Sequence, residues 1–146
     1  MQKVGNQMST INKKVLERFF EEIYNQGNLS AADELVAATY ISHNPAPGEA
    51  PGREGLKSFV AYLRRAFADL HVTIEAQVAE GDRVATRYTL RGRQAGEFAG
   101  IPPTGKLVTV TATSMHRIAD GRIQESWLNW DMLGLIRQLV SDELIR

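Results

Sequence analysis

Hydrophobic and polar positions follow two different periods in the two halves of the chain. Apolar residues recur at helical spacing over residues 11–24 and again over residues 53–68, which predicts two amphipathic helices. Between residues 72 and 130, long stretches alternate apolar and polar residues, as half-buried strands do. We therefore predict an antiparallel meander in the second half. A closing helix follows, with Leu133, Ile136, Leu139 and Val140 as its apolar positions.

Local signals place the boundaries of the first helix. Ser9 or Thr10 is a suitable N-terminal cap, and Gly27 is placed to end the helix. Residues 1–8 carry no comparable signal. We therefore expect a disordered extension over residues 1–8 and a single domain over residues 9–146.

Other signals mark the connections. Ser30 is placed to cap a short second helix, and residues 40–44 form a short extended piece before a loop rich in Pro and Gly at residues 45–52. Asp120-Gly121 is the dipeptide most characteristic of a two-residue hairpin turn. The fold class we predict is α+β, in which a curved antiparallel or mixed sheet wraps around the N-terminal helices. A sheet curled in this way forms a cone with a cavity between sheet and helices.

One strand face in the last hairpin gathers polar side chains. If the second strand continues to residue 131, then alternation puts five side chains on one face, namely Ile123, Glu125, Trp127, Asn129 and Asp131. A carboxylate beside a large aromatic ring is a candidate general base, because desolvation raises its pKa. The alternatives are that Glu125 and Asp131 are exposed, or that Asp131 only caps the following helix.

The other strand of that hairpin carries His116. Val108, Val110 and Ala112 make its side of the strand the more apolar one, so we place His116 on the inner face. From there it could approach Asp131 and hold a proton or orient the carboxylate. The alternative is a strand histidine that only bonds to a neighbour.

Further candidates come from the helices and from the expected mouth of the cone. Tyr24, Phe59 and Tyr88 lie at apolar positions and either belong to the core or contact a ligand. His43 follows the short extended piece, where it either contacts substrate or anchors the Pro-rich loop.

Composition narrows the classes of function. The 146 residues carry 17 Lys and Arg against 17 Asp and Glu, and this zero net charge argues against nucleic acid or an anionic membrane as partner. The chain has no cysteine, which excludes disulfides and thiol catalysis and is compatible with the cytoplasm, where we expect the protein. The three histidines, His43, His71 and His116, are far apart in sequence, so we predict no metal site. No Gly-rich phosphate loop precedes a helix, so we predict no bound nucleotide.

Several motifs together resemble a known family. They are GEFAGIPPTGK at residues 96–106, HRIADGRI at 116–123, ESWLNWD at 125–131, LIRQL at 135–139, FEEIYNQGN at 20–28 and YISHNP at 40–45. In this order, over residues 10–140, they resemble the SnoaL-like polyketide cyclases, often called ester cyclases. The resemblance implies the cone-shaped fold of nuclear transport factor 2, ketosteroid isomerase and scytalone dehydratase.

The resemblance also implies a reaction. An aspartate at the position of Asp131 would act as acid and base in an intramolecular aldol ring closure on a small apolar carbonyl compound, without metal or cofactor. His116 would assist, and Trp127, Asn129 and Glu125 would help to form the substrate site. A homodimer or homotetramer is implied, built on the exposed face of the sheet.

The chain departs from the family pattern at Gln94, which stands where many relatives carry a histidine. Glutamine can polarise a carbonyl group, but it cannot carry a proton at neutral pH. Three hypotheses follow from these observations. In order of preference they are a cyclase or related isomerase or lyase, a non-catalytic module that binds a small ligand, and an assembly domain.

Overall fold

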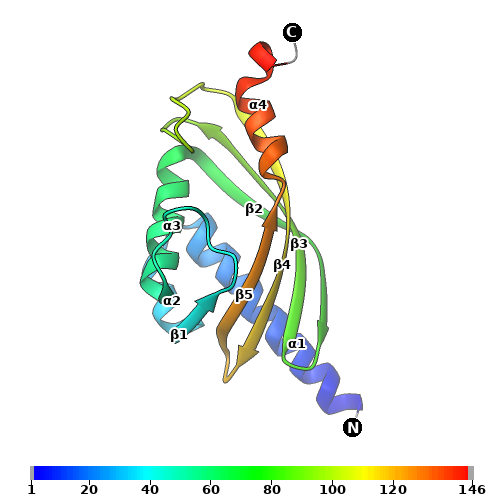
Figure 1. Cartoon of the computed structure of the whole chain (residues 1–146). Helices are drawn as coiled ribbons and strands as arrows, with labels where there is room; N and C mark the ends of the chain where they lie inside the picture. The colour runs from blue at the N-terminus through cyan, green and yellow to red at the C-terminus, as the bar shows by residue number, and fades with distance from the viewer. Residues whose placement is uncertain (1, 145–146) are drawn as a thin grey trace.

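Helices cover one face of a single five-stranded sheet in the computed structural model, which describes residues 2–144 (Figure 1). The helical elements are α1 (Gln2–Arg18), the π-helical segment η1 (Phe19–Asn25), the 3-10 turn η2 (Leu29–Ala31), α2 (Ala32–Leu35), α3 (Gly52–Ala66) and α4 (Met132–Leu144). The strands are β1 (Val36–Ser42), β2 (Phe67–Glu80), β3 (Arg83–Gln94), β4 (Leu107–Ala119) and β5 (Arg122–Trp130). This arrangement confirms the predicted α+β class.

The sheet is mixed, with strand order β1-β5-β4-β3-β2. Strands β2 to β5 form the predicted antiparallel meander, and β1 joins it by pairing parallel with β5. The two ends of the sheet do not meet, so β1 and β2 remain edge strands and the cone is open. Among the described residues, no helix is long and apolar enough to cross a membrane.

The first helix begins earlier than its cap signal predicts. Residues 2–8, expected to be a disordered extension, continue α1 as helix, and Ser9 and Thr10 lie inside it. Extending an existing helix adds about one hydrogen bond per residue fixed, so a good internal cap does not by itself stop it. Residue 1 lies outside the described residues.

The hairpin turn forms where it was predicted. Asp120 and Gly121 have φ angles of 55° and 71°, and Ala119 pairs with Arg122 across the two-residue loop. Positive φ at both central positions is the signature of the type I′ turn, whose twist matches that of the two strands.

A β-bulge near the start of β5 changes the face that each later side chain occupies. Arg117 pairs with Glu125, whereas the next residue, Ile118, pairs with Ile123, so Gln124 is the extra residue. Ile123 is buried, and beyond the bulge the even-numbered residues turn inward, beginning with the buried Ser126. The predicted face that joined Ile123 to Glu125, Trp127 and Asn129 is therefore wrong, because the extra residue reverses the alternation.

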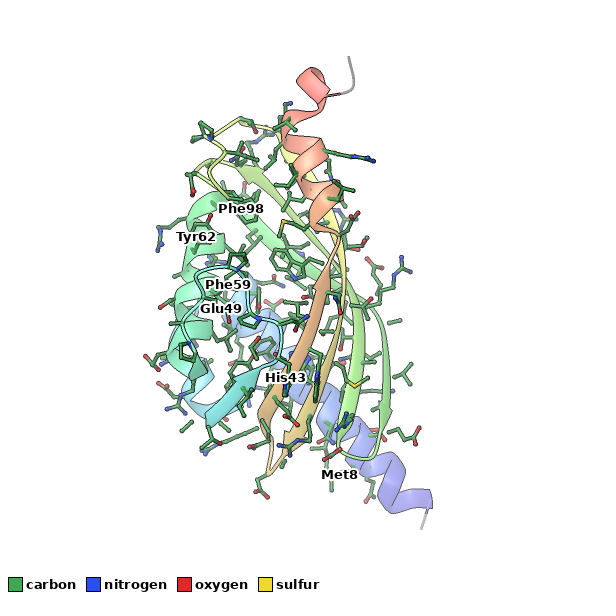
Figure 2. All side chains as sticks on the ribbon, viewed as in Figure 1. Met8, His43, Glu49, Phe59, Tyr62 and Phe98 are labelled. Atoms are coloured by element: carbon green, nitrogen blue, oxygen red, sulfur yellow. The ribbon has the colours of Figure 1, made fainter. Side chains whose placement is uncertain are left out.

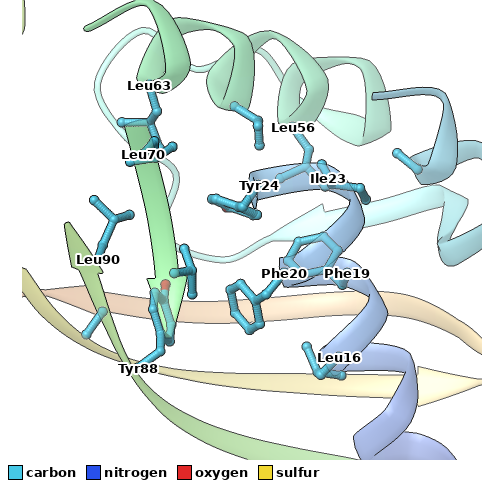
Figure 3. Close-up of a cluster of buried hydrophobic side chains, with 14 of the residues drawn as sticks. Leu16, Phe19, Phe20, Ile23, Tyr24, Leu56, Leu63, Leu70, Tyr88 and Leu90 are labelled. Carbon is cyan, nitrogen blue, oxygen red and sulfur yellow. The ribbon is translucent and has the colours of Figure 1, made fainter. Parts of the chain in front are cut away.

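The core is packed between the helices and the inner face of the sheet. Aromatic side chains of η1 dominate it, and Phe20 lies against Tyr88 of β3 with ring centroids 4.6 Å apart (Figure 3). The predicted apolar face of β4 is confirmed, since its buried residues alternate with exposed ones along the strand.

Two sets of side-chain hydrogen bonds hold the end of η1 in place. The side-chain amide of Asn25 accepts the Val72 N–H at 2.7 Å and donates to the Val72 carbonyl at 3.1 Å. The guanidinium of Arg64 on α3 donates to the carbonyls of Tyr24 and Asn25 at 2.6 and 2.9 Å. The Arg64 bonds satisfy helix-end carbonyls, and both sets of bonds fix the aromatic residues of η1 over the sheet.

Candidate active site

A cavity of about 730 Å³ opens between the sheet and the helices. Its size is typical of sites for small organic molecules, which fall at roughly 300–1,000 Å³. Its lining is mostly apolar and aromatic, with side chains that include Phe19, Phe20, Phe59, Tyr62, Phe98, Leu128 and Trp130. Tyr62 and Phe98 lie at one end of it, where α3 faces the loop between β3 and β4 (Figure 2). The cavity wall thus consists of rings and a small number of polar groups.

His116 is a buried polar side chain of the lining. It reaches the cavity from β4, as predicted, and is 5% exposed. Its Nδ1 atom and the neighbouring hydroxyl of Ser114 have no hydrogen-bond partner among the described residues. The ring packs near Phe19, with centroids 5.6 Å apart. Unsatisfied buried polar atoms are rare in folded proteins, so these two groups are available to a ligand.

Burial also decides the charge of His116. Desolvation lowers its pKa from 6.5 to about 4, because the charged ring loses its hydration. At neutral pH the side chain is therefore an imidazole that offers one N–H donor and one nitrogen acceptor.

A hydroxyl pair enters the same part of the cavity. The Tyr40 hydroxyl of β1 lies 2.5 Å from Ser126 Oγ of β5, and both side chains are buried. Ser126 pairs with His116 in the sheet register, so the pair and the imidazole sit at the same level. The bulge at Gln124 is what turns Ser126 inward.

Glu49 contributes a carboxylate to the lining from the loop at residues 43–51. Partial burial raises its pKa, although the Ala46 N–H that its Oε1 accepts at 3.1 Å acts in the opposite direction. Of the described residues that line the cavity, it is the one Asp or Glu, and none is Lys or Arg.

Three aromatic residues expected near a ligand do line the cavity. Tyr24, Phe59 and Tyr88 come from η1, α3 and β3. Burial raises the pKa of both tyrosines, so the phenols are neutral at physiological pH. The Tyr88 hydroxyl accepts a hydrogen bond from Trp130 Nε1 at 3.2 Å, whereas Phe59 tilts toward the Trp130 ring at 5.9 Å.

Three other predicted site residues lie on the outer face of the sheet. The Glu125 carboxylate accepts hydrogen bonds from His43 Nε2 and Arg117 Nε, both at 2.8 Å, and these bonds lower its pKa. Trp127 stacks on His43 with ring centroids 4.5 Å apart. Glu125 therefore lacks the raised pKa expected of a desolvated general base, and neither His43, Glu125 nor Trp127 borders the cavity.

Asp131 lies beyond the end of β5 and caps α4. It is exposed, and its Oδ1 accepts the Gly134 N–H at 2.9 Å, so the alternative of a helix cap describes its position. Ser126 pairs with His116, and Asp131 follows Ser126 by five positions, which is roughly 16 Å along the sheet. The predicted approach of His116 to Asp131 is therefore wrong. Asn129 is exposed and borders the cavity.

Gln94 is buried but does not border the cavity. Its amide donates to the Ile101 carbonyl at 3.0 Å and accepts from the backbone N–H and the hydroxyl of Thr104 at 3.0 and 2.7 Å. All its polar atoms thus hold the loop between β3 and β4. The expected contact of Gln94 with substrate is not present in this arrangement.

Sequence reasoning missed Ser114, Ser126, Tyr40 and Glu49. Alternation along β4 already places Ser114 beside His116 on the inner face, so that signal was available. Ser126 was missed because the bulge reverses the face that its side chain occupies. Glu49 lies in a loop, where no periodicity indicates which way a side chain points.

No group of three or more His, Asp or Glu side chains among the described residues is placed to hold a metal ion. Outside the cavity, Thr109, Thr111 and Thr113 lie exposed on the outer sheet face, as alternation along β4 predicts. Assembly through this face stays a prediction.

The fold and the cavity together define a cone-shaped α+β protein with a mostly apolar cavity, and comparison with known proteins places it in a family. The model of the SnoaL-like polyketide cyclases matches residues 14–139. The chain belongs to this family. It is 32% identical over 131 residues to the aklanonic acid methyl ester cyclase DnrD of Streptomyces peucetius, covering 85% of this chain and 88% of that protein. It is 30% identical over 123 residues to the aklanonic acid methyl ester cyclase AcmA of Streptomyces galilaeus, covering 81% and 83%.

Solved structures agree with this assignment. TsrD from Streptomyces laurentii matches with a TM-score of 0.82 and 32% identity, covering 89% of this chain and 95% of that chain. IdmH from Streptomyces antibioticus matches with a TM-score of 0.77 and 34% identity, covering 88% and 97%.

Proposed function

We propose that this protein closes a ring in a small carbonyl-rich ester by an intramolecular aldol reaction inside the cavity. The observation that carries the proposal is His116, a buried neutral imidazole with an unsatisfied nitrogen in an apolar cavity of about 730 Å³. The names of the relatives DnrD and AcmA support an ester of this type as substrate.

The reaction needs a base, a carbonyl that accepts the new bond, and a donor that stabilises the developing negative charge. The base removes an acidic proton between two carbonyl groups. The resulting enolate carbon attacks a ketone in the same molecule, and the new alkoxide takes the proton back.

His116 is suited to the role of donor. A neutral imidazole N–H polarises a carbonyl without the cost of burying a charge, and the low pKa of His116 keeps it in that form. The nearby hydroxyls of Ser114 and of the Tyr40–Ser126 pair can donate to the same oxygen. The aromatic walls exclude water from the enolate.

The test is turnover of aklanonic acid methyl ester, followed by chromatography and mass spectrometry. The melting temperature of His116→Gln should still rise when the ester is added, because the cavity is kept. Its kcat should fall by roughly 10²-fold or more. His71→Gln, which changes an exposed histidine of β2, serves as the matched control and should turn over normally.

Asp131→Asn belongs in the same assay, because the role that the family resemblance implies for Asp131 stays a prediction. Asn caps a helix as well as Asp does, so the variant removes only the titratable group. If wild type binds the ester and never converts it, a non-catalytic binding module becomes the better hypothesis.

A further inference from the structure

We propose that Glu49 recognises the substrate by accepting a hydrogen bond from one of its hydroxyl groups, an inference that rests on the proposed function. The observation that carries it is the single carboxylate that the described residues contribute to the cavity wall, with one of its oxygens unbonded. The substrate class is then a neutral aromatic compound with both carbonyl and hydroxyl groups. Glu49 transfers no proton, and the acid and base role that the family resemblance implies for Asp131 is unchanged.

The loop that bears Glu49 is fixed at both ends. Next to β1, the Asn44 side-chain amide bonds to both backbone groups of Leu128 on β5. Next to α3, the Ala50 carbonyl packs against Gly55, where the Cβ atom of any other residue would lie only 1.7 Å from the carbonyl oxygen. A side chain on an anchored segment loses less conformational freedom when it binds a ligand, so Glu49 is suited to recognition.

One oxygen of Glu49 is held and the other is available. Oε1 accepts the Ala46 N–H at 3.1 Å, and the Glu49 N–H donates back to the Ala46 carbonyl at 2.9 Å. Oε2 makes no hydrogen bond to the described residues. The side chain lies close to Phe59 of α3, which belongs to the aromatic wall (Figure 2). Oε2 is therefore the acceptor that a donor group on an aromatic ligand can use.

The negative charge of Glu49 acts on the interior of the cavity. Burial is the main cause of the raised pKa of Tyr24 and of Tyr40, and the Glu49 carboxylate adds to the rise in both. Partial burial also raises the pKa of Glu49 itself. A carboxylate that affects two buried phenols is incompletely screened by solvent, so a ligand in the cavity experiences its charge.

No cation in the described lining compensates Glu49. The lining contains no Lys or Arg, and His116 is a neutral imidazole at neutral pH. A ligand that fills the cavity excludes water from Oε2, and a partly buried carboxylate oxygen without a donor is unfavourable. A ligand hydroxyl replaces the lost bond with a charge-assisted one. A ligand carboxylate instead meets an uncompensated like charge, so the free acid is disfavoured.

Glu49 and His116 select different substituents. The imidazole and the Ser114 hydroxyl can donate to a carbonyl oxygen, whereas an ionised carboxylate can only accept. A substrate that presents a hydroxyl to Glu49 and a carbonyl to His116 satisfies both, and the reversed orientation satisfies neither. Glu49 thus determines the orientation of the substrate as well as its class.

Binding of small probes tests the proposal without turnover. Naphthol, acetylnaphthalene and naphthoate, substituted at the same ring position, present an O–H donor, a carbonyl acceptor and an anion on one aromatic frame. Their dissociation constants are measured by titration at neutral pH for wild type, Glu49→Gln, Glu49→Asp and the control Glu75→Gln, which changes an exposed carboxylate of β2. Wild type should bind naphthol about tenfold more tightly than acetylnaphthalene, and naphthoate most weakly.

The variant Glu49→Gln should reverse this order. Its amide oxygen can still accept the Ala46 N–H, which turns the amide NH₂ donor toward the position of Oε2. Acetylnaphthalene should then bind at least as tightly as naphthol, and naphthoate should gain about tenfold in affinity. Glu49→Asp keeps the anion and should keep the wild-type order, as should Glu75→Gln. Thermal unfolding without ligand checks that each variant is folded.

Steady-state kinetics with aklanonic acid methyl ester separate recognition from proton transfer. Glu49→Gln should raise KM by about tenfold and change kcat by less than about threefold, because it removes a contact made equally in the ground state and the transition state. Asp131→Asn should lower kcat instead. A lower kcat at unchanged KM in Glu49→Gln would overturn the assignment of Glu49 to recognition.

The outcomes separate the two proposals. If wild type turns the ester over but shows no preference for naphthol, or if Glu49→Gln keeps the wild-type order, Glu49 does not recognise a hydroxyl although the cyclase function stands. If Glu49→Gln reverses the order and wild type binds the ester without converting it, recognition by Glu49 stands and the cyclase function is overturned.

Discussion

His116 and Ser126 face each other across β4 and β5, and both side chains are buried at the wall of one cavity. The pairing brings an imidazole beside the hydroxyl pair that Ser126 forms with Tyr40 at 2.5 Å. Three polar groups from three strands thus meet at one level of an otherwise aromatic site. The predictions below test the elements that hold this site in place.

Burial of His116 makes the protein sensitive to mild acid. The folded-state pKa of about 4 lies below the unfolded value of 6.5, so acid favours the unfolded chain. This contribution is complete above pH 6.5 and is lost as the pH falls toward 4, by on the order of 3 kcal/mol. Between pH 7 and pH 4.5, the free energy of unfolding measured in urea titrations should fall less for His116→Gln than for wild type. Equal losses in the variant and wild type would contradict this account.

Gly55→Ala should destabilise the protein, although alanine is the better helix former. Within α3, replacing Gly by Ala would normally gain up to about 1 kcal/mol. Here the added methyl would meet the Ala50 carbonyl oxygen at 1.7 Å, and relieving such overpacking costs about 1–3 kcal/mol. Denaturant unfolding should therefore show a net loss, and turnover should fall because Ala50 belongs to the loop that lines the cavity. Gly48→Ala is the matched loop control, since nothing lies within 4 Å of its added carbon, although its φ of 82° adds strain.

Asp131→Ala should weaken the start of α4. Removing the oxygen that accepts the Gly134 N–H costs about 1 kcal/mol, whereas Asp131→Asn should change stability by only a few tenths. Thermal unfolding of the two variants checks the difference. If both variants unfold like wild type, the cap contributes nothing.

Gln94→Ala should loosen the loop between β3 and β4. The substitution leaves the part-buried Thr104 N–H and Ile101 carbonyl without their partner, at a cost of roughly 1–3 kcal/mol for each group. Hydrogen exchange at the Thr104 amide should accelerate. Gln94→His should not raise turnover, because this position does not border the cavity. A rate gain in Gln94→His would show that the loop brings residue 94 to the substrate.

Much of the fold was predictable because its signals are local. The helical spacing, the Asp120-Gly121 turn and the alternation along β4 each depend on neighbouring residues, and His116 was placed correctly from such alternation. The site was predicted less well for a physical reason. The bulge at Gln124 inserts one residue into β5 and moves Glu125 and Trp127 outward. No local sequence pattern indicates such an insertion.

The loop residues show a second limit. Glu49 faces the cavity because its loop is anchored on β5 and packed against Gly55, contacts between segments far apart in sequence. Asp131 lies at the strand end that alternation would have continued, but there the chain turns into α4 and the carboxylate bonds to its own helix.

The bulge in β5 also has an evolutionary consequence. Because strand side chains alternate with period two, a gain or loss of one residue at position 124 exchanges which of the following β5 side chains face the cavity. Such a change would replace Ser126 and Leu128 by Glu125 and Trp127 while leaving the backbone path of the sheet nearly unchanged. Single-residue length variation at this point is therefore a route by which relatives could acquire new substrates in one step.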